Sequence, residues 1–244
     1  SGGPGGNGGE GCDGGTGGTG NGGAAGPVAV TLVSSGGTGG SGGTGGSGGT
    51  GGESLLSATL PVGVGLTSEV LSGTGLTLRQ QLIAASNPRI SNDPAFREVV
   101  DEGIDQYVPT VTDQAQVTVR TLTLTAGSSL TVAPTTPVVV NGAMGTGEDS
   151  ATHPLRQEAL VIDVRGLPPG TEVRLDNVEF GIVIGAARIV GGNGRNFVVG
   201  DDTDQFIVLG EGDDVLRGGG GNDTVGSKGG DDKIYGDGGN DWLV

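Results

Sequence analysis

The sequence is poor in aromatic residues, cysteine and histidine. Aromatic side chains make up 3% of the 244 residues, and there is one cysteine, Cys12, and one histidine, His153. We therefore expect no large globular core, since aromatic side chains bury more surface than most others. A single cysteine excludes an internal disulfide, and the distant His153 does not supply the nearby base that a catalytic thiol needs. His153 lies in a polar stretch and is expected on the surface.

Positive charge is also scarce. Twelve Lys and Arg residues stand against 28 Asp and Glu residues, which gives a formal net charge of -16 and a pI near 4.1. Such a chain is repelled by nucleic acid and by anionic membranes, whereas divalent cations are its natural counterions. No run approaches the roughly 18 apolar residues of a membrane span, and no basic, apolar signal peptide stands at the start. We expect no nucleic-acid partner, no membrane span and, because the chain starts with Ser1, a processed product.

Recognisable catalytic motifs are missing. The chain contains no HExxH or GxxxxGK[ST] pattern, and GxSxG occurs only within the Gly-Gly-x triplets, at 39–43 and 45–49. A repetitive chain with few aromatic residues also leaves little room for a substrate pocket. We therefore expect that the protein is not an enzyme.

Glycine, by contrast, is abundant. It occupies 56 positions, and 27 of them lie in residues 1–52, chiefly as Gly-Gly-x triplets. This composition predicts a Gly-rich N-terminal arm, either a flexible linker or an arm ordered as extended threefold helices. Within it, residues 27–33 (PVAVTLV) form a β-prone run. A lone strand cannot satisfy its backbone groups, so this run either folds back on its own domain or is donated to the sheet of a neighbouring subunit.

The middle of the chain has a more ordinary composition. Residues 53–110 predict a short helical packing segment, with one helix from Thr77 to Ala85 and a second that uses Asp93 as N-cap and Pro94 as its first residue. Residues 111–190 predict successive strands of a β-solenoid or sandwich. The predicted strand sequences are QVTVRTLTLT, SSLTVA, TPVVVNG, EALVIDVRGLP, TEVRLDNVEFGIVIG and AARIVGG.

Residues 191–244 repeat with a period of nine. Six units follow one another without a slip: GGNGRNFVV, GDDTDQFIV, LGEGDDVLR, GGGGNDTVG, SKGGDDKIY and GDGGNDWLV. The eighth position is always aliphatic, which a solvated tail has no reason to maintain, so we predict that these side chains point inward and form a thin apolar core. They are Val198, Ile207, Leu216, Val225, Ile234 and Leu243. Counting back in nines from Val198 predicts that the inward row begins earlier, at Phe180 and Ile189.

The units resemble the repeats of the RTX family of secreted bacterial proteins, whose unit is GGxGxDxUx and whose repeats wind into a calcium-loaded parallel β-roll. The resemblance implies that two units make one coil and that alternate units stack. Units three and five would then pair Asp214 with Asp232 around one Ca²⁺ ion, and units four and six would pair Asp223 with Asp241 around another. Backbone carbonyls complete the implied ligand set, and they belong to Asp213, Gly220, Asn222, Gly229, Asp231, Gly238 and Asn240.

The first two units depart from the family pattern. Asn196 and Gln205 are neutral where the pattern has aspartate. We expect weak or no calcium binding there, with these units continuing the fold, and at least two ions in the four later units. Without an ion the clustered carboxylates repel one another, so metal binding and folding are expected to be one event.

The expected fold class is therefore mainly β. We predict a parallel β-roll or β-solenoid in which residues 191–244 form the calcium-binding nonapeptide repeats, preceded by the strand region, the short helical segment and the Gly-rich arm.

Two functions remain open from the sequence. The first is a secreted, calcium-stabilised structural protein, a self-assembling subunit of an extracellular fibre, matrix or surface layer. It rests on the roll, on the candidate for strand donation and on the uncapped solenoid end at Trp242–Val244, which suggest a homo-oligomer or filament. The alternative, which the family resemblance implies, is the calcium-dependent folding and secretion module of a larger toxin or hydrolase exported by a type I system. An adhesin or ice-binding protein would need more rows of Thr than VTVRTLTLT supplies.

Overall fold

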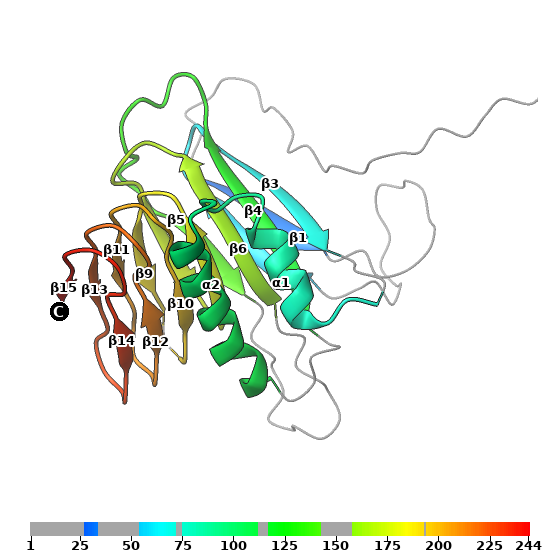
Figure 1. The fold of residues 1–244 in the computed structure, drawn as a ribbon. Coiled ribbons are helices and arrows are strands. Elements are labelled where there is room, and N and C mark those ends of the chain that lie inside the picture. Colours follow the sequence, from blue (N-terminus) through cyan, green and yellow to red (C-terminus); the bar gives the residue numbers. More distant parts are fainter. Residues whose placement is uncertain (1–26, 34–53, 72–74, 112–116, 143–157, 193) are drawn as a thin grey trace, which may run out of the picture.

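The computed structural model places most of the chain in two β-sheets that face each other (Figure 1). It describes residues 27–33, 54–71, 75–111, 117–142, 158–192 and 194–244. The predictions for Cys12, for His153 and for an ordered glycine-rich arm fall outside these residues. Within these residues the fold is mainly β, with a parallel β-solenoid and two short α-helices, as the sequence predicts.

In the described part of the chain, sheet I has eight strands and sheet II has seven. In spatial order sheet I contains β1 (Val28–Val33), β2 (Ser54–Leu60), β5 (Val138–Gly142), β7 (Glu172–Asp176), β9 (Arg188–Gly191), β11 (Phe206–Val208), β13 (Thr224–Gly226) and β15 (Trp242–Leu243). Sheet II contains β14 (Lys233–Tyr235), β12 (Val215–Arg217), β10 (Phe197–Val199), β8 (Phe180–Ile184), β6 (Glu158–Gly166), β4 (Thr118–Ala126) and β3 (Val64–Leu71). From β4 and β5 onward the chain alternates between the sheets, and all these later pairs are parallel.

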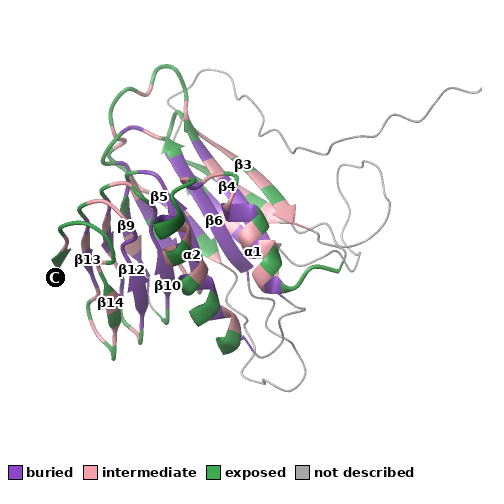
Figure 2. Ribbon diagram, viewed as in Figure 1, coloured by how far each residue is buried: buried purple, intermediate pink, exposed green. Residues whose placement is uncertain are grey.

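The repeat has the predicted register. Leu216 on β12 aligns with Val198 on β10 and with Ile234 on β14, so each coil contains two units of the repeat. Alternate units therefore stack in the same sheet. The eighth-position side chains turn inward, and those of the first four units are almost fully buried between the sheets. Burial then declines toward β14 and β15 (Figure 2).

Two α-helices cover the outer face of sheet II (Figure 1). Helix α1 (Leu78–Ser86) begins with a capping box in which Thr77 and Gln80 satisfy each other's backbone N–H groups. Helix α2 (Pro94–Tyr107) uses Asp93 as N-cap, as predicted, and a 3₁₀ turn, η1 (Val108–Thr110), follows it. Phe96, Val100, Ile104 and Tyr107 recur at helical spacing and form a second core with sheet II.

One predicted position is wrong by a single residue. Phe180 aligns with Phe197 rather than with Val198, and Gly181 takes the inward place beside Val198. Because side chains alternate along a strand, this shift turns Phe180 outward, where it stacks on Tyr107 with ring centroids 4.2 Å apart. Ile189 does lie in the inward row, aligned with Ile207.

Three other segments differ from the sequence-based expectation. Residues 54–71, predicted as part of a helical segment, form β2 and β3, and SSLTVA (128–133) is a turn region rather than a strand. TEVRLDNVEFGIVIG divides into two strands, β7 and β8, in different sheets.

The run at 27–33 forms β1, which pairs antiparallel with β2 of the same chain, so the structure has the first of the two predicted alternatives.

Neither of the two described helices combines the length and the apolar character that crossing a membrane requires.

Candidate metal centre

The turns of the repeat line up along two edges of the roll. The Asp214 edge contains the turns that precede β10, β12 and β14 (191–192 with 194–196, 209–214 and 227–232). The Asp223 edge contains those that precede β11, β13 and β15 (200–205, 218–223 and 236–241). Asp214 and Asp232 thus share one edge, and Asp223 and Asp241 share the other, as the predicted stacking requires.

Glycine at the fourth position of the unit makes this close stacking possible. Gly221 and Gly239 have φ values of +101° and +125°, a region that other residues rarely adopt. A Cβ atom on Gly239 would lie 1.6 Å from the carbonyl oxygen of Gly221, in the turn stacked directly before it on the same edge, which we call the neighbouring rung. A side chain cannot be accommodated there, so the backbones of neighbouring turns approach each other directly.

The sixth-position carboxylates tie each turn to the turn before it. The backbone N–H of Asp223 donates to Asp241 Oδ1 (2.9 Å), and that of Gln205 donates to Asp223 Oδ1 (2.8 Å). On the other edge the N–H of Asp214 donates to Asp232 Oδ1 (3.0 Å), and that of Asn196 donates to Asp214 Oδ1 (2.7 Å). One oxygen of each carboxylate therefore already has a partner, and the second oxygen decides what else the turn can bind.

The fifth-position side chains form a second ladder, in which each side chain accepts from a backbone N–H of the following turn rather than of the preceding turn. The N–H of Asp231 donates to Asp213 Oδ1 (2.9 Å), and the N–H of Asn240 donates to Asn222 Oδ1 (3.1 Å). The turns also join through bridges, such as the one between Gly220 and Gly238.

Of the predicted carbonyl ligands, Gly229 is already engaged, because its oxygen accepts from the N–H of Gly212 at 2.6 Å. The predicted residues are thus brought together in stacked turns, but as two separate groups, one on each edge.

Asp223 holds the least satisfied carboxylate of the repeat. The residue is 2% exposed, and its Oδ2 atom is buried without a hydrogen-bond partner. Burial is the main cause that raises the pKa of Asp223 to about 7; the negative charges of Asp241, Asp204 and Asp201 contribute to this rise, and the hydrogen bond from the N–H of Gln205 opposes it. An unpartnered buried carboxylate oxygen is costly, and a bound cation is one way to satisfy it.

The space beside this oxygen is lined by glycine. A Cβ atom on Gly218 would lie 2.6 Å from Asp223 Oδ2 and 2.8 Å from the carbonyl oxygen of Gly236, so both oxygens face the same small volume. A carboxylate oxygen and a carbonyl oxygen are ligands of the kind that Ca²⁺ prefers. The oxygen atoms that face this space on the Asp223 edge are therefore suitable ligands for a hard divalent cation.

The Asp214 edge differs at the corresponding point. Ser227 occupies the first position of its unit, where Gly218 and Gly236 stand on the other edge. Its hydroxyl donates to Asp214 Oδ2 at 2.8 Å, so a protein group satisfies the second oxygen. The nonapeptide pattern predicts two equivalent edges. The signal that could have separated them is this serine in place of glycine.

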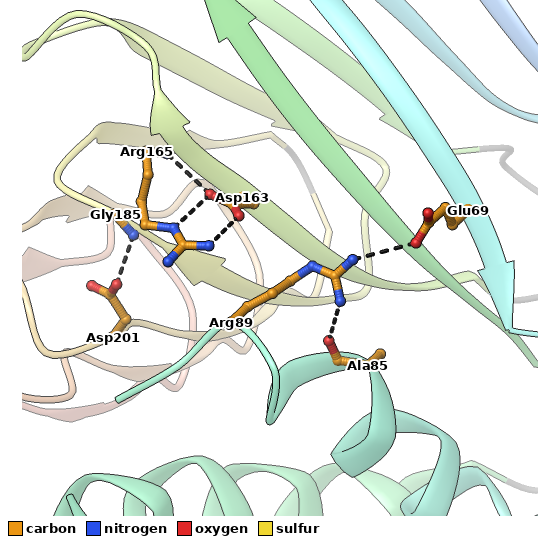
Figure 3. A network of polar contacts seen from close by, with 7 residues as sticks. All are labelled: Glu69, Ala85, Arg89, Asp163, Arg165, Gly185 and Asp201. Carbon is orange, nitrogen blue, oxygen red and sulfur yellow. Dashed lines mark hydrogen bonds and ion pairs between the residues drawn. The ribbon is translucent and has the colours of Figure 1, made fainter. Parts of the chain in front are cut away.

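In the two earliest turns side-chain amides donate to the preceding rung, while Asn196 Oδ1 is buried without a hydrogen-bond partner. Asn196 donates through Nδ2 to the carbonyl oxygen of Val178 (2.8 Å), and Gln205 donates through Nε2 to that of Gly185 (2.9 Å). Asp201 also accepts from Gln205 Nε2 (3.1 Å) and from the N–H of Gly185 (2.7 Å), as Figure 3 shows for Gly185. These amides were predicted only as missing ligands, whereas in the structure they are donors.

A buried arginine connects helix α2 with the last turn of the Asp223 edge. Arg217, at the end of β12, forms two hydrogen bonds with the carboxylate of Asp237 (2.7 and 3.2 Å) and an ion pair with Glu102 of α2 (2.6 Å). The Arg217 side chain is 6% exposed and that of Asp237 is 9% exposed. This link between the helix and the turn carries no signal in the nonapeptide pattern.

Within the described part of the chain, no three His, Cys, Asp or Glu side chains gather into a metal-binding group. A site on either edge would therefore depend on backbone carbonyls as well as carboxylates. Comparisons with protein-family models, with curated proteins and with solved structures found no match for this chain. The fold itself defines the class: a two-sheet, mainly parallel β-solenoid with one helix-covered face.

Proposed function

We propose that residues 209–244 bind Ca²⁺ between stacked turns, in the manner of the RTX repeats that they resemble, and that the ion stabilises the roll. The observation that carries this proposal is the buried, unpartnered Oδ2 atom of Asp223 beside the glycine-lined space on its edge. Bound calcium would supply the positive charge that this carboxylate lacks.

The Asp223 edge is the stronger of the two proposed sites. There the ion would be held by Asp223 and Asp241 together with the carbonyl oxygen of Gly236 and those of Gly220, Asn222, Gly238 and Asn240. On the Asp214 edge Ser227 already bonds the carboxylate, and the carbonyl of Gly229 already accepts from Gly212. We propose that Asp214, Asp232, Asp213 and Asp231 bind a second ion more weakly.

We further propose that the protein is secreted and acts as a calcium-stabilised structural subunit of an extracellular fibre, matrix or surface layer. Binding sites in extracellular calcium modules have dissociation constants of about 10⁻⁴–10⁻³ M, a range suited to an ion held partly by carbonyl oxygens. The elongated two-sheet solenoid supports a structural role, since each rung contacts chiefly its neighbours and builds length rather than a pocket.

Strand β1 offers a route to self-assembly. It lies at the edge of sheet I, where Val30 and Leu32 pack against the core and Val28 is 55% exposed. The stretch between β1 and β2, residues 34–53, has glycine at 12 of its 20 positions. Exchange of β1 between two copies would keep the same contacts, so we propose that concentrated protein associates by this exchange.

A calcium titration of the whole chain tests the metal site. Circular dichroism and isothermal calorimetry are expected to report a gain of β-structure and heat of binding with a midpoint of about 0.1–1 mM free Ca²⁺. Mg²⁺ at equal concentration serves as the control, because its demand for octahedral geometry suits these turns poorly. Identical spectra in calcium and in chelator, with no binding heat, would refute the proposal.

A further inference from the structure

We infer that the outer face of sheet I binds the guanidinium group of an arginine side chain from a partner polypeptide, between Phe206 and Trp242. The binding position lies over Thr224, the residue that separates the two aromatic residues in the sheet, and we call it the Thr224 gap. This inference goes beyond the proposed calcium binding and uses none of the proposed metal ligands.

Arginine stacks on an aromatic ring twice within this chain, each time across one strand spacing. The guanidinium carbon of Arg188 lies 3.9 Å from the ring centroid of Phe206, and that of Arg217 lies 5.0 Å from the ring centroid of Tyr235. In both pairs the two residues are aligned on neighbouring parallel strands. An arginine in this register therefore covers the aromatic face beside it, which is a favourable cation–π contact.

Trp242 has a threonine where the other two aromatic residues have an arginine. Outside the core beneath the helices, the aromatic residues of the chain are Phe206, Tyr235 and Trp242. Thr224 holds the aligned position next to Trp242, and its side chain is too short to cover an indole ring. Trp242 is 71% exposed, against 39% for Tyr235 beneath Arg217, so its ring is accessible to a ligand.

The second aromatic face at the gap belongs to Phe206. Arg188 on β9 covers one face of this ring, so the opposite face is turned toward β13, where the aligned residue is Thr224. Two strand spacings, about 9.5 Å, separate Phe206 from Trp242. This separation leaves room for one planar group between two rings.

The surroundings of the gap favour a guanidinium group over other ligands. A guanidinium is planar and can stack on both rings, whereas the ammonium group of lysine is compact and more strongly hydrated. The Thr224 hydroxyl, at the base of the gap, can accept one of its N–H groups. The formal net charge of -16 attracts a cation to the surface. Both described helices pack on sheet II, so neither obstructs a polypeptide on the outer face of sheet I (Figure 1).

The fluorescence of Trp242, the single tryptophan of the chain, tests the inference. The whole protein in excess calcium is titrated at constant ionic strength with N-acetyl-arginine amide, which represents an arginine side chain in a polypeptide. Neutral N-acetyl-citrulline amide and cationic N-acetyl-lysine amide are the matched control probes. We expect the fluorescence to change with half-saturation in the millimolar range for the arginine probe, and about fivefold weaker binding or less of either control.

Two matched variants locate the site. Thr224→Arg should place the chain's own guanidinium beside Trp242, so it should change the fluorescence without any probe and lower the affinity for the arginine probe by about tenfold. Thr59→Arg adds the same charge to the same face of sheet I, where its aligned neighbours are aliphatic, and should leave both quantities unchanged.

Equal responses to the arginine probe and to either control probe would overturn the inference, as would an unchanged affinity in Thr224→Arg. Circular dichroism checks that this variant folds, and Phe206→Leu gives a second decision if it does not. Loss of one ring should weaken arginine binding by about threefold, and an unchanged affinity would exclude the Thr224 gap as the site. Because all probes are compared at one calcium concentration, the outcome is separate from the test of the metal site.

Discussion

The solenoid body and the nonapeptide roll share one architecture but are held together by different interactions. In the body, strands of four to nine residues bury aliphatic side chains between the sheets and, under α1 and α2, on the outer face of sheet II. In the roll, strands of two or three residues contribute one inward side chain each, and polar ladders along the turns join the rungs. The body is therefore stabilised mainly by apolar burial, and the roll mainly by hydrogen bonds of its backbone and carboxylate groups.

The largest difference in stability between the two regions is expected when a core side chain of the body is truncated. Phe180→Ala removes a fully buried ring that stacks on Tyr107, and it should lower the free energy of unfolding by about 3–5 kcal/mol in calcium and in chelator alike. Urea denaturation measures this. Phe206→Ala is the matched control, since that ring is only half-buried beneath Arg188 and should cost about 1–2 kcal/mol. Equal losses for the two variants would contradict the assigned difference in packing.

A smaller and more local effect is expected where helix and roll meet. Arg217→Met removes the partner of Asp237 and Glu102, and we expect a loss of about 2 kcal/mol, concentrated in β14 and β15, because hydrogen bonds to charged groups are involved. Hydrogen exchange by segment measures it. Arg188→Met serves as the control, since the exposed pair of Arg188 with Glu172 should contribute at most about 1 kcal/mol. Uniform loss of protection across the chain would argue against a local link.

The two edges of the roll are also expected to differ in how strongly a substitution changes the calcium midpoint. Asp223→Ala should raise the calcium midpoint by about tenfold or more, because it removes the unpartnered oxygen. Asp214→Ala should raise it less, since Ser227 already bonds that carboxylate. Calorimetric titrations of both variants give the midpoints. A greater effect for Asp214→Ala would reverse the proposed ranking of the sites.

The smallest effect concerns the edge strand of the body. In a Cys12→Ser background, the single variants Ala29→Cys and Thr59→Cys are mixed, since these two residues lie opposite each other in the β1–β2 pair. Exchange of β1 should yield a minor, concentration-dependent fraction of disulfide-linked heterodimer, seen on a non-reducing gel, because the tether favours pairing within one chain. Ala29→Cys mixed with Arg188→Cys is the off-register control. Equal yields in both mixtures, or none at millimolar concentration, would exclude specific exchange.

The roll could be predicted from the sequence because its signal is local and repeated. A nine-residue period fixes which side chains share a face and which units share a sheet, and capping residues such as Asp93 mark the start of a helix. The body could not be predicted as well, because its coils vary in length. Ile189 aligns with Val173 and Val198 aligns with Gly181, and both of these coils are shorter than two full units, so counting in nines fails at Phe180.

The candidate site shows a similar limit. The pairing of Asp223 with Asp241 on one edge follows from the period, and the register confirms that these units stack. The two edges differ in how their carboxylates are bonded because the hydroxyl of Ser227 donates to the Asp214 carboxylate in an earlier turn. Whether an amide acts as a missing ligand or as a donor likewise depends on which carbonyls the preceding rung presents, and residue type alone does not encode that.

The alternation of units between two sheets constrains how such a chain can change in length. Deleting one unit, 209–217, would move β13 from sheet I into sheet II, so that Thr224 and Gly226 would replace Val215 and Arg217 opposite α2. Deleting two units, 209–226, would instead keep every remaining carboxylate on its original edge, with Asp232 next to Asn196 and Asp241 next to Gln205. Insertions and losses that preserve the architecture must therefore occur in even numbers of repeats.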